Sequence, residues 1–83
     1  MALKIQWLDT ADISRLAFGA SIEEVEKVIR SGHDEPNPAH LPKGRRYRLG
    51  KTNDGRTLRV EITESADHRS VTVQLVVIDP DRL

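Results

Sequence analysis

The sequence contains no cysteine. Disulfide bonds and thiolate metal sites are therefore excluded, and a reducing compartment is permitted. No apolar run approaches the ~20 residues that a membrane-spanning helix needs, and the first residues lack the basic region and long apolar core of a secretory signal. We therefore expect a cytoplasmic protein with no membrane contact.

Aromatic side chains are scarce, at 4% of the chain. The three are Trp7, Phe18 and Tyr47. Proteins that recognise single-stranded RNA stack its bases on exposed aromatic rings, so this composition offers little for base stacking. Any contact with nucleic acid would depend instead on charge.

Net charge is also absent, because 13 Lys and Arg side chains balance 13 Asp and Glu side chains. The two signs are nevertheless separated along the chain. Residues 1–42 carry four basic and seven acidic side chains, whereas residues 43–83 carry nine basic and six acidic ones. Between Lys43 and Arg59 there are seven basic side chains and one acid, Asp54. The zero total conceals a polarised molecule with clustered cations, which is the pattern that phosphate contacts use.

The chain has 83 residues, of which 37% are hydrophobic, and it has room for a single domain spanning residues 1–83. Such a short chain buries roughly 60–65% of the surface that its unfolded form exposes, so its core is marginal. A partner or a dimer contact would help to stabilise it.

Two helices are predicted in the first half of the chain. Asp9 or Thr10 can cap the first helix. Its apolar residues fall on one face, which we expect to be buried: Ile13, Leu16 and Ala17. The second helix begins with a capping box, in which Ser21 and Glu24 bond each other's backbone amides. Its apolar stripe comprises Ile22, Val25, Val28 and Ile29.

Four strands are predicted around these helices. Residues 3–7 alternate apolar and polar side chains, as a half-buried strand does. A hairpin pairs residues 45–49 with 56–63 around an Asn-Asp-Gly turn, and a β-branched segment at 70–78 forms the last strand. The segment 33–42 contains three prolines and is predicted to be a loop. The order β-α-α-β-β-β predicts an α+β fold, with an antiparallel sheet of about four strands and two short helices on one face.

Alternation along the strands predicts which side chains face the helices. The inward set is Tyr47, Leu49, Leu58, Val60, Ile62, Val71, Val73, Leu75 and Val77. The outward set is Lys4, Gln6, Arg46, Arg48, Arg59 and Glu61, among several Thr and Gln residues. Fixed cations separated by neutral hydrogen-bonding groups suit a sugar-phosphate backbone. The alternative is that these charges form the ordinary solvated side of a sheet, where basic residues also discourage aggregation.

Motifs for other chemistry are weak. Gly-Lys-Thr at 50–52 follows the previous glycine at the wrong spacing for a P-loop, and it enters a turn where a helix is required. Four residues with metal-binding side chains fall in the proline-rich segment: His33, Asp34, Glu35 and His40. Their spacing matches no zinc site, so we expect neither a metal nor another cofactor. Histidine is the side chain most often used in general acid–base catalysis, so His68 is a candidate, although an isolated turn histidine is more often simply exposed.

Several short motifs occur in a recognisable order. They are Ile5-Gln6-Trp7-Leu8-Asp9, Gly19-Ala20-Ser21-Ile22-Glu23-Glu24, Arg46-Tyr47-Arg48-Leu49-Gly50, Gly55-Arg56-Thr57-Leu58-Arg59-Val60 and Thr63-Glu64. This order resembles the BrnT family, small ribonuclease toxins of bacterial type II toxin–antitoxin pairs with a RelE-related fold. The chain departs from the family at residues 17–19, where the family has Lys-His-Gly, and at residues 77–79, where it has Ser-Ala-Arg. The family's basic C-terminal helix is also missing.

The resemblance implies a toxin-type domain, and with the basic hairpin it predicts a protein that binds RNA through a basic sheet face. Cleavage of the bound RNA is left open by the sequence, and if it occurs it is expected to need no metal. The candidate RNA-binding residues are Lys4, Arg46, Arg48, Arg56 and Arg59. The candidate catalytic residues are His68, as the proton carrier, and Arg59, which would stabilise charge. The expected partners are RNA, an antitoxin protein that covers the basic face, and a second copy of the chain. The alternative function is a non-catalytic protein-interaction or oligomerisation module of the same fold, which the missing family cations favour.

Overall fold

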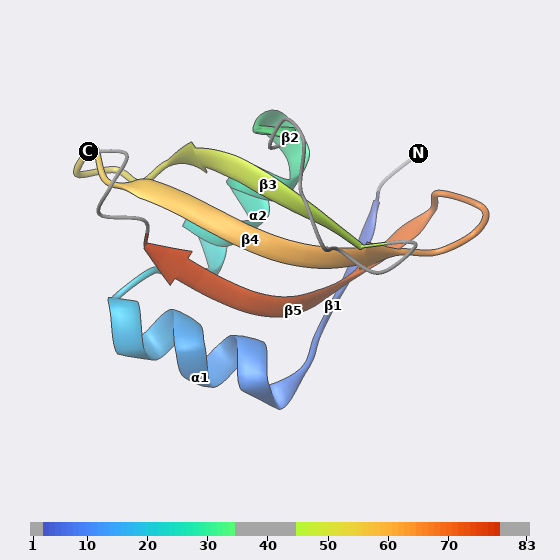
Figure 1. Cartoon of the computed structure of the whole chain (residues 1–83), viewed down its shortest axis with the longest axis horizontal. Coiled ribbons are helices and arrows are strands. Elements are labelled where there is room, and N and C mark those ends of the chain that lie inside the picture. Colours follow the sequence, from blue (N-terminus) through green and yellow to red (C-terminus); the bar gives the residue numbers. More distant parts are fainter. Residues whose placement is uncertain (1–2, 35–44, 79–83) are drawn as a thin grey trace.

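The computed structural model describes residues 3–34 and 45–78. They form an α+β fold with two helices and a five-stranded sheet (Figure 1). The elements in chain order are β1 (Lys4–Trp7), α1 (Asp9–Phe18), α2 (Ile22–Ser31), β2 (His33–Asp34), β3 (Arg45–Lys51), β4 (Thr57–Glu64) and β5 (Ser70–Ile78). No helix in this described part is long and apolar enough to cross a membrane.

The strands are arranged in the order β1-β5-β4-β3-β2. β1 runs parallel to β5, whereas the other neighbouring strands are antiparallel, so the sheet is mixed. The expected antiparallel sheet of about four strands differs from it in two respects. The chain crosses over through both helices between β1 and the other strands, and the crossover leaves β1 parallel to its neighbour. In addition, His33 and Asp34 of the expected loop pair with Leu49 and Arg48 as β2, while the rest of that loop lies outside the described residues.

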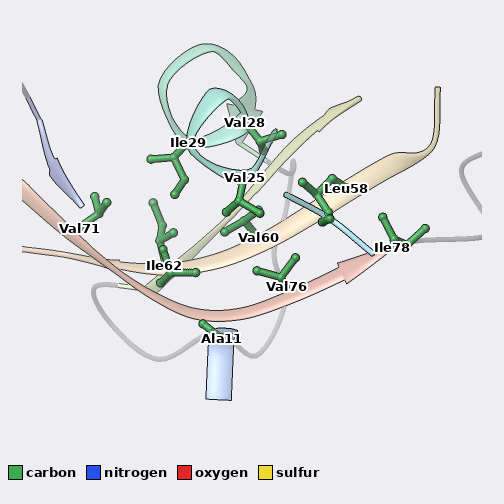
Figure 2. Packing of buried hydrophobic residues seen from close by; sticks show 12 residues of the cluster. Ala11, Val25, Val28, Ile29, Leu58, Val60, Ile62, Val71, Val76 and Ile78 are labelled. Atoms are coloured by element: carbon green, nitrogen blue, oxygen red, sulfur yellow. The ribbon is translucent and has the colours of Figure 1, made fainter. Parts of the chain in front are cut away.

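α2 covers one face of the sheet, where it packs against β3 and β4. Its predicted capping box is confirmed. The Ser21 hydroxyl accepts a hydrogen bond from the Glu24 amide at 3.0 Å, and the Glu24 carboxylate accepts one from the Ser21 amide at 3.0 Å. The core under this helix is shown in Figure 2 and comprises mainly Val25, Val28, Ile29, Leu58, Val60, Ile62, Val71, Val73, Val76 and Ile78.

α1 lies along the edge of β5 (Figure 1). The Thr10 hydroxyl donates a hydrogen bond to the Gln74 carbonyl at 3.1 Å, and the Ser14 hydroxyl accepts one from the Val76 amide at 3.0 Å. These side chains occupy backbone groups that an edge strand would otherwise leave unpaired. Only the small Ala11 of α1 is fully buried in the core.

The predicted buried face of α1 is wrong. Ile13 and Leu16 are 67% and 62% exposed, and Ala17 is exposed as well. The physical reason is that α1 docks through hydroxyl groups on its other side, so its apolar stripe points away from the sheet.

A β-bulge interrupts the alternation of β5. The register of the β4–β5 pair shifts at Glu61 and Ile62, so that Glu61 lies opposite Leu75 while Ile62 lies opposite Val73. The extra residue reverses the faces beyond it. Val76 and Ile78 are therefore buried, Leu75 is 41% exposed and Val77 is partly exposed. The prediction was right for Val71 and Val73 and wrong for the second half of the strand.

The predicted facing of β3 is wrong: Tyr47 and Leu49 were expected on the helix side of the sheet, and Arg46 and Arg48 on the other side. Arg46 lies opposite Ile62 and Arg48 lies opposite Val60, so both arginines share the α2 side of the sheet. Tyr47 and Leu49 alternate with them and lie on the other side. Leu49 is nevertheless buried, with 2% of its surface exposed.

Candidate functional site

A cluster of charged side chains lies on the α2 side of β2, β3 and β4. We call it the Glu64 cluster; its members are Asp34, Arg46, Arg48, Glu64 and His68. One Glu64 oxygen lies 3.1 Å from Nη2 of Arg46, and the other lies 2.8 Å from Nδ1 of His68. Glu64 thus joins an arginine to a histidine.

The strand register brings the arginines to their acidic partners. Arg48 lies directly opposite Asp34 in the β2–β3 pair, and its Nη1 is 3.0 Å from the Asp34 carboxylate. Its Nη2 donates to the Gly32 carbonyl at 2.6 Å, which ties β3 to the end of α2. Arg46 also approaches Asp34, at 3.5 Å. The two arginines are held at a fixed spacing along one strand.

His68 is placed by the tight turn between β4 and β5. Its φ of 60° is in the left-handed region, and its amide donates to the Ser65 carbonyl at 3.0 Å. The Asp67 carboxylate in the same turn accepts hydrogen bonds from the Ser65 hydroxyl at 2.6 Å and from the Arg69 amide at 3.1 Å. These bonds lower the pKa of Asp67, with the Ser65 hydroxyl contributing most. The turn is therefore held by the charged form of Asp67.

The members of the Glu64 cluster differ in exposure. Side-chain exposure is 75% for His68 and 40% for Arg46, but only 20% for Glu64 and 16% for Arg48. Among the described residues, the Nε atoms of Arg46 and Arg48 are buried without a hydrogen-bond partner. Glu64 and Arg48 therefore form the buried base of the cluster, and the imidazole of His68 and the guanidinium of Arg46 are accessible above them.

Arg59 lies on the opposite face of the sheet from the Glu64 cluster. Its guanidinium carbon is 5.0 Å from the centre of the Tyr47 ring, a cation–π distance. Lys4 lies on that same face, because its neighbours Ile5 and Trp7 pack against the core on the other side. The predicted face is therefore divided: Lys4 and Arg59 are on one side, and Arg46 and Arg48 are on the other.

Arg56 is part of the β3–β4 turn. It bonds the Asp54 carboxylate at 2.9 Å and donates to the Phe18 carbonyl at 3.1 Å, which links the turn to the end of α1. Hydrogen bonds from the Thr52 hydroxyl and from Arg56 lower the pKa of Asp54 to about 2. Arg56 thus has a structural role in this hairpin, away from the Glu64 cluster.

The two predicted catalytic residues are not brought together. His68 contacts Glu64, which shares the Ile62 side of β4, whereas Arg59 points to the other side of the same strand. The predictions also missed Glu64 and Asp34 as members of the site. The sequence could have indicated Glu64, because it lies four residues before His68 on the other side of a short turn, and residues that flank a hairpin turn lie close in space.

Metal binding has no support in the described residues. Within residues 3–34 and 45–78, no three His, Asp or Glu side chains are grouped so that they could hold a metal ion. His33 and Asp34 form β2, while Glu35 and His40 lie outside the described part.

A cavity lies near the other end of β3. Its described lining is His33, Leu49, Gly50, Lys51 and Thr57. The Lys51 ammonium donates to the Thr57 hydroxyl at 3.0 Å. Apart from His33 and Lys51, the described lining of this cavity carries no ionisable side chain.

Comparison with known proteins gives no family for this chain. No protein-family model matches it, and neither curated proteins nor solved structures match it.

Proposed function

We propose that this chain is a BrnT-like, cytoplasmic α+β domain that binds RNA at the Glu64 cluster and cleaves it without metal. The observation that carries the proposal is the position of Glu64 between Arg46 and His68. A carboxylate, a histidine and an arginine in contact supply the proton transfer and the positive charge that cleavage of a phosphodiester needs.

The cluster suits attack by the ribose 2′-hydroxyl on the adjacent phosphate. Glu64 accepts from Nδ1 of His68, which leaves Nε2 of the neutral imidazole able to take the 2′-hydroxyl proton. The 2′-oxygen then bonds to phosphorus, the bond to the 5′-oxygen breaks, and that oxygen takes a proton from water. The proton that His68 has taken neutralises the hydroxide left behind, which restores the neutral imidazole. Arg46 would stabilise the negative charge on the pentacoordinate phosphate, and Arg48, which bonds Asp34 and the Gly32 carbonyl, would add positive charge from beneath.

Of the five basic residues predicted to bind RNA, Arg56 is held in the β3–β4 turn away from the Glu64 cluster, and the other four have different parts in this proposal. Arg46 contacts the phosphate at the reacting bond, and Arg48 supports it from the buried base of the cluster. Lys4 and Arg59 lie on the other face and could contact only a separate stretch of RNA. Arg59 has no catalytic part, because the sheet separates it from His68.

The test is incubation of the purified protein with total RNA in EDTA, followed by gel analysis. We expect His68→Ala to lower cleavage roughly 100-fold or more, the usual effect of removing a general base, while RNA retention is kept. Arg46→Ala combined with Arg48→Ala should weaken retention and reduce its salt dependence.

Arg45→Ala is the matched control. Arg45 is also on β3, but it lies on the other face and pairs with Glu61 at 3.6 Å. Equal losses in the control and the double variant would count against the Glu64 cluster. Circular dichroism of each variant would verify that the fold is intact.

A second candidate is the non-catalytic interaction module. The exposed Ile13 and Leu16 on α1 favour it, because large apolar side chains grouped at a surface commonly mark a contact site. Growth on expression separates the two functions: a ribonuclease toxin should stop growth, and a binding module should be tolerated.

A further inference from the structure

An apolar surface extends from α1 onto the neighbouring strand. We call it the α1 patch; its members are Ile13, Leu16, Ala17 and Leu75. Ile13 and Leu16 are more than 60% exposed, and Leu75 is 41% exposed. Residues spaced by three and four positions share one side of a helix, so the three α1 members form a single stripe.

Hydrogen bonds place Leu75 beside this stripe. Thr10 and Ser14 bond the backbone at Gln74 and Val76, so they bracket Leu75 along the edge of β5. Leu75 lies opposite Glu61 and therefore faces away from α2. Positions 13 and 17 follow Thr10 and Ser14 by three residues, which places them on adjacent rows of the helix.

The accessible charge on α1 is acidic. Asp9 is exposed in the first turn, and the Asp12 side chain is 50% exposed. Arg15 is the only basic residue of the helix; its side chain is 13% exposed and bonds Asp12 and the Ala20 carbonyl. The α1 patch therefore has two carboxylates at one end. The helix itself adds no accessible positive charge beside them.

We propose that the α1 patch docks a cationic amphipathic helix of another protein. Leucine or isoleucine side chains on that helix would pack between Ile13, Leu16 and Leu75, and its basic side chains would meet Asp9 and Asp12. A second copy fits less well, since two α1 helices would bring two exposed Asp9 carboxylates together, and the one basic side chain of each helix, Arg15, is already bonded to Asp12. This inference rests on the interaction-module function proposed above.

The probe is a fluorescein-labelled 14-residue peptide of leucine and lysine in amphipathic helical order, titrated with the purified chain and followed by fluorescence anisotropy. We expect saturable binding that Leu16→Ser weakens at least tenfold. Asp9→Asn combined with Asp12→Asn should weaken it several-fold and reduce its salt dependence. The same peptide with glutamate in place of lysine should not bind.

Two control variants are available on α2. Ile22 is 44% exposed, so Ile22→Ser removes an exposed apolar side chain outside the patch, and Glu23→Gln removes an exposed acid. Both should bind the lysine peptide as the parent chain does. If the controls weaken binding as much as the patch variants do, or if the lysine peptide fails to bind, the inference is overturned.

Sedimentation analysis of the chain alone distinguishes the failures. A dimer that Leu16→Ser dissociates, with no peptide binding, would overturn the helix partner and leave an oligomerisation module. A monomer that binds no peptide would remove both the inference and the surface on which the interaction module depends. Leu16→Ser, Ile22→Ser and Glu23→Gln alter exposed residues, so their thermal unfolding should match that of the parent chain. Asp12→Asn also removes the ion pair with Arg15, so Asp9→Asn alone is the charge variant that leaves stability unchanged.

Discussion

Gly50 lies directly beneath Val28, so closely that a Cβ atom on residue 50 would be 2.8 Å from Cγ2 of that valine. This contact joins β3 to α2 two residues beyond Arg48, which belongs to the Glu64 cluster on the same side of the strand. It also explains why the α2 side of β3 has no large apolar side chain here.

Gly50→Ala should destabilise the fold by about 1–3 kcal/mol, the usual cost of overpacking. Val28 is 2% exposed and β-branched, so its methyl group cannot easily move aside. Urea unfolding measures the change. Adding Val28→Ala should make the glycine substitution nearly neutral in a double-mutant cycle; independent, additive effects would show that the two residues are not in contact.

The β-bulge predicts opposite outcomes at two adjacent positions. Val76→Ala should lower the free energy of unfolding by about 1.5–3 kcal/mol, because the side chain is fully buried. Leu75→Ala removes more atoms but should cost less, since Leu75 is 41% exposed. The reverse order in urea unfolding would mean that β5 alternates without a bulge.

Glu24 should make stability dependent on pH. Its pKa is lowered by hydrogen bonds from the Ser21 amide first and the Asn53 amide second. Because the folded pKa lies below the ordinary value of 4.5, the stabilisation is fully present above that pH and is lost as the pH falls through the folded value. Glu24→Gln should therefore destabilise at neutral pH, and the difference from the parent chain should shrink as the pH falls below 4.5.

Glu23→Gln is the control for this experiment, because Glu23 is exposed in the same turn. Thermal melts between pH 3 and pH 7 measure all three proteins. A Glu24→Gln difference that stays constant over this range would contradict a role for the charged carboxylate.

Asp54 should titrate near pH 2 in the folded chain, against an ordinary value of 3.8. The Thr52 hydroxyl is the largest single cause, and the Arg56 side chain adds a hydrogen bond and a positive charge, so Thr52→Val and Arg56→Ala should each raise this pKa toward 3.8. Carboxyl carbon shifts in an NMR pH titration report the value directly. A parent value close to 3.8 would show that the Thr52 and Arg56 bonds do not favour the charged form.

The elements with strong local signals were predictable from the sequence. α2 has a capping box at Ser21 and an apolar stripe with helical period, and both depend only on residues close in the chain. Strict alternation in β4 likewise identified Leu58, Val60 and Ile62 as buried. Local patterns therefore gave the α+β class and much of the core.

The errors concern relations between elements. The side of the sheet on which Arg46 and Arg48 lie depends on the register of β3 against β4. A single extra residue, Gln74, reverses the alternation in the second half of β5. The apolar stripe of α1 that contains Ile13 is exposed because the helix docks on β5 through Thr10 and Ser14. The positions of these two hydroxyl groups in the sequence do not indicate that they bond a distant strand. Each error has its cause in a contact between distant residues.

The candidate site was predictable only in part for the same reason. The sequence predicted Arg46, Arg48 and His68 as functional residues, because basic side chains are clustered along the β3–β4 hairpin and His68 follows in the next turn. Glu64 and Asp34 were missed, because their importance arises from pairing across strands, which a one-dimensional pattern does not display.

The parallel pairing of β1 with β5 has a consequence for synthesis on the ribosome. Ile5 and Trp7 lie opposite Val71 and Val73, so β1 cannot pair until β5, the last of the described strands, has left the exit tunnel. α1 waits as well, since its hydroxyl groups bond the same late strand. Pairings between segments far apart in sequence slow folding. The nascent chain should therefore remain open to proteases and chaperones until residues 70–78 have emerged.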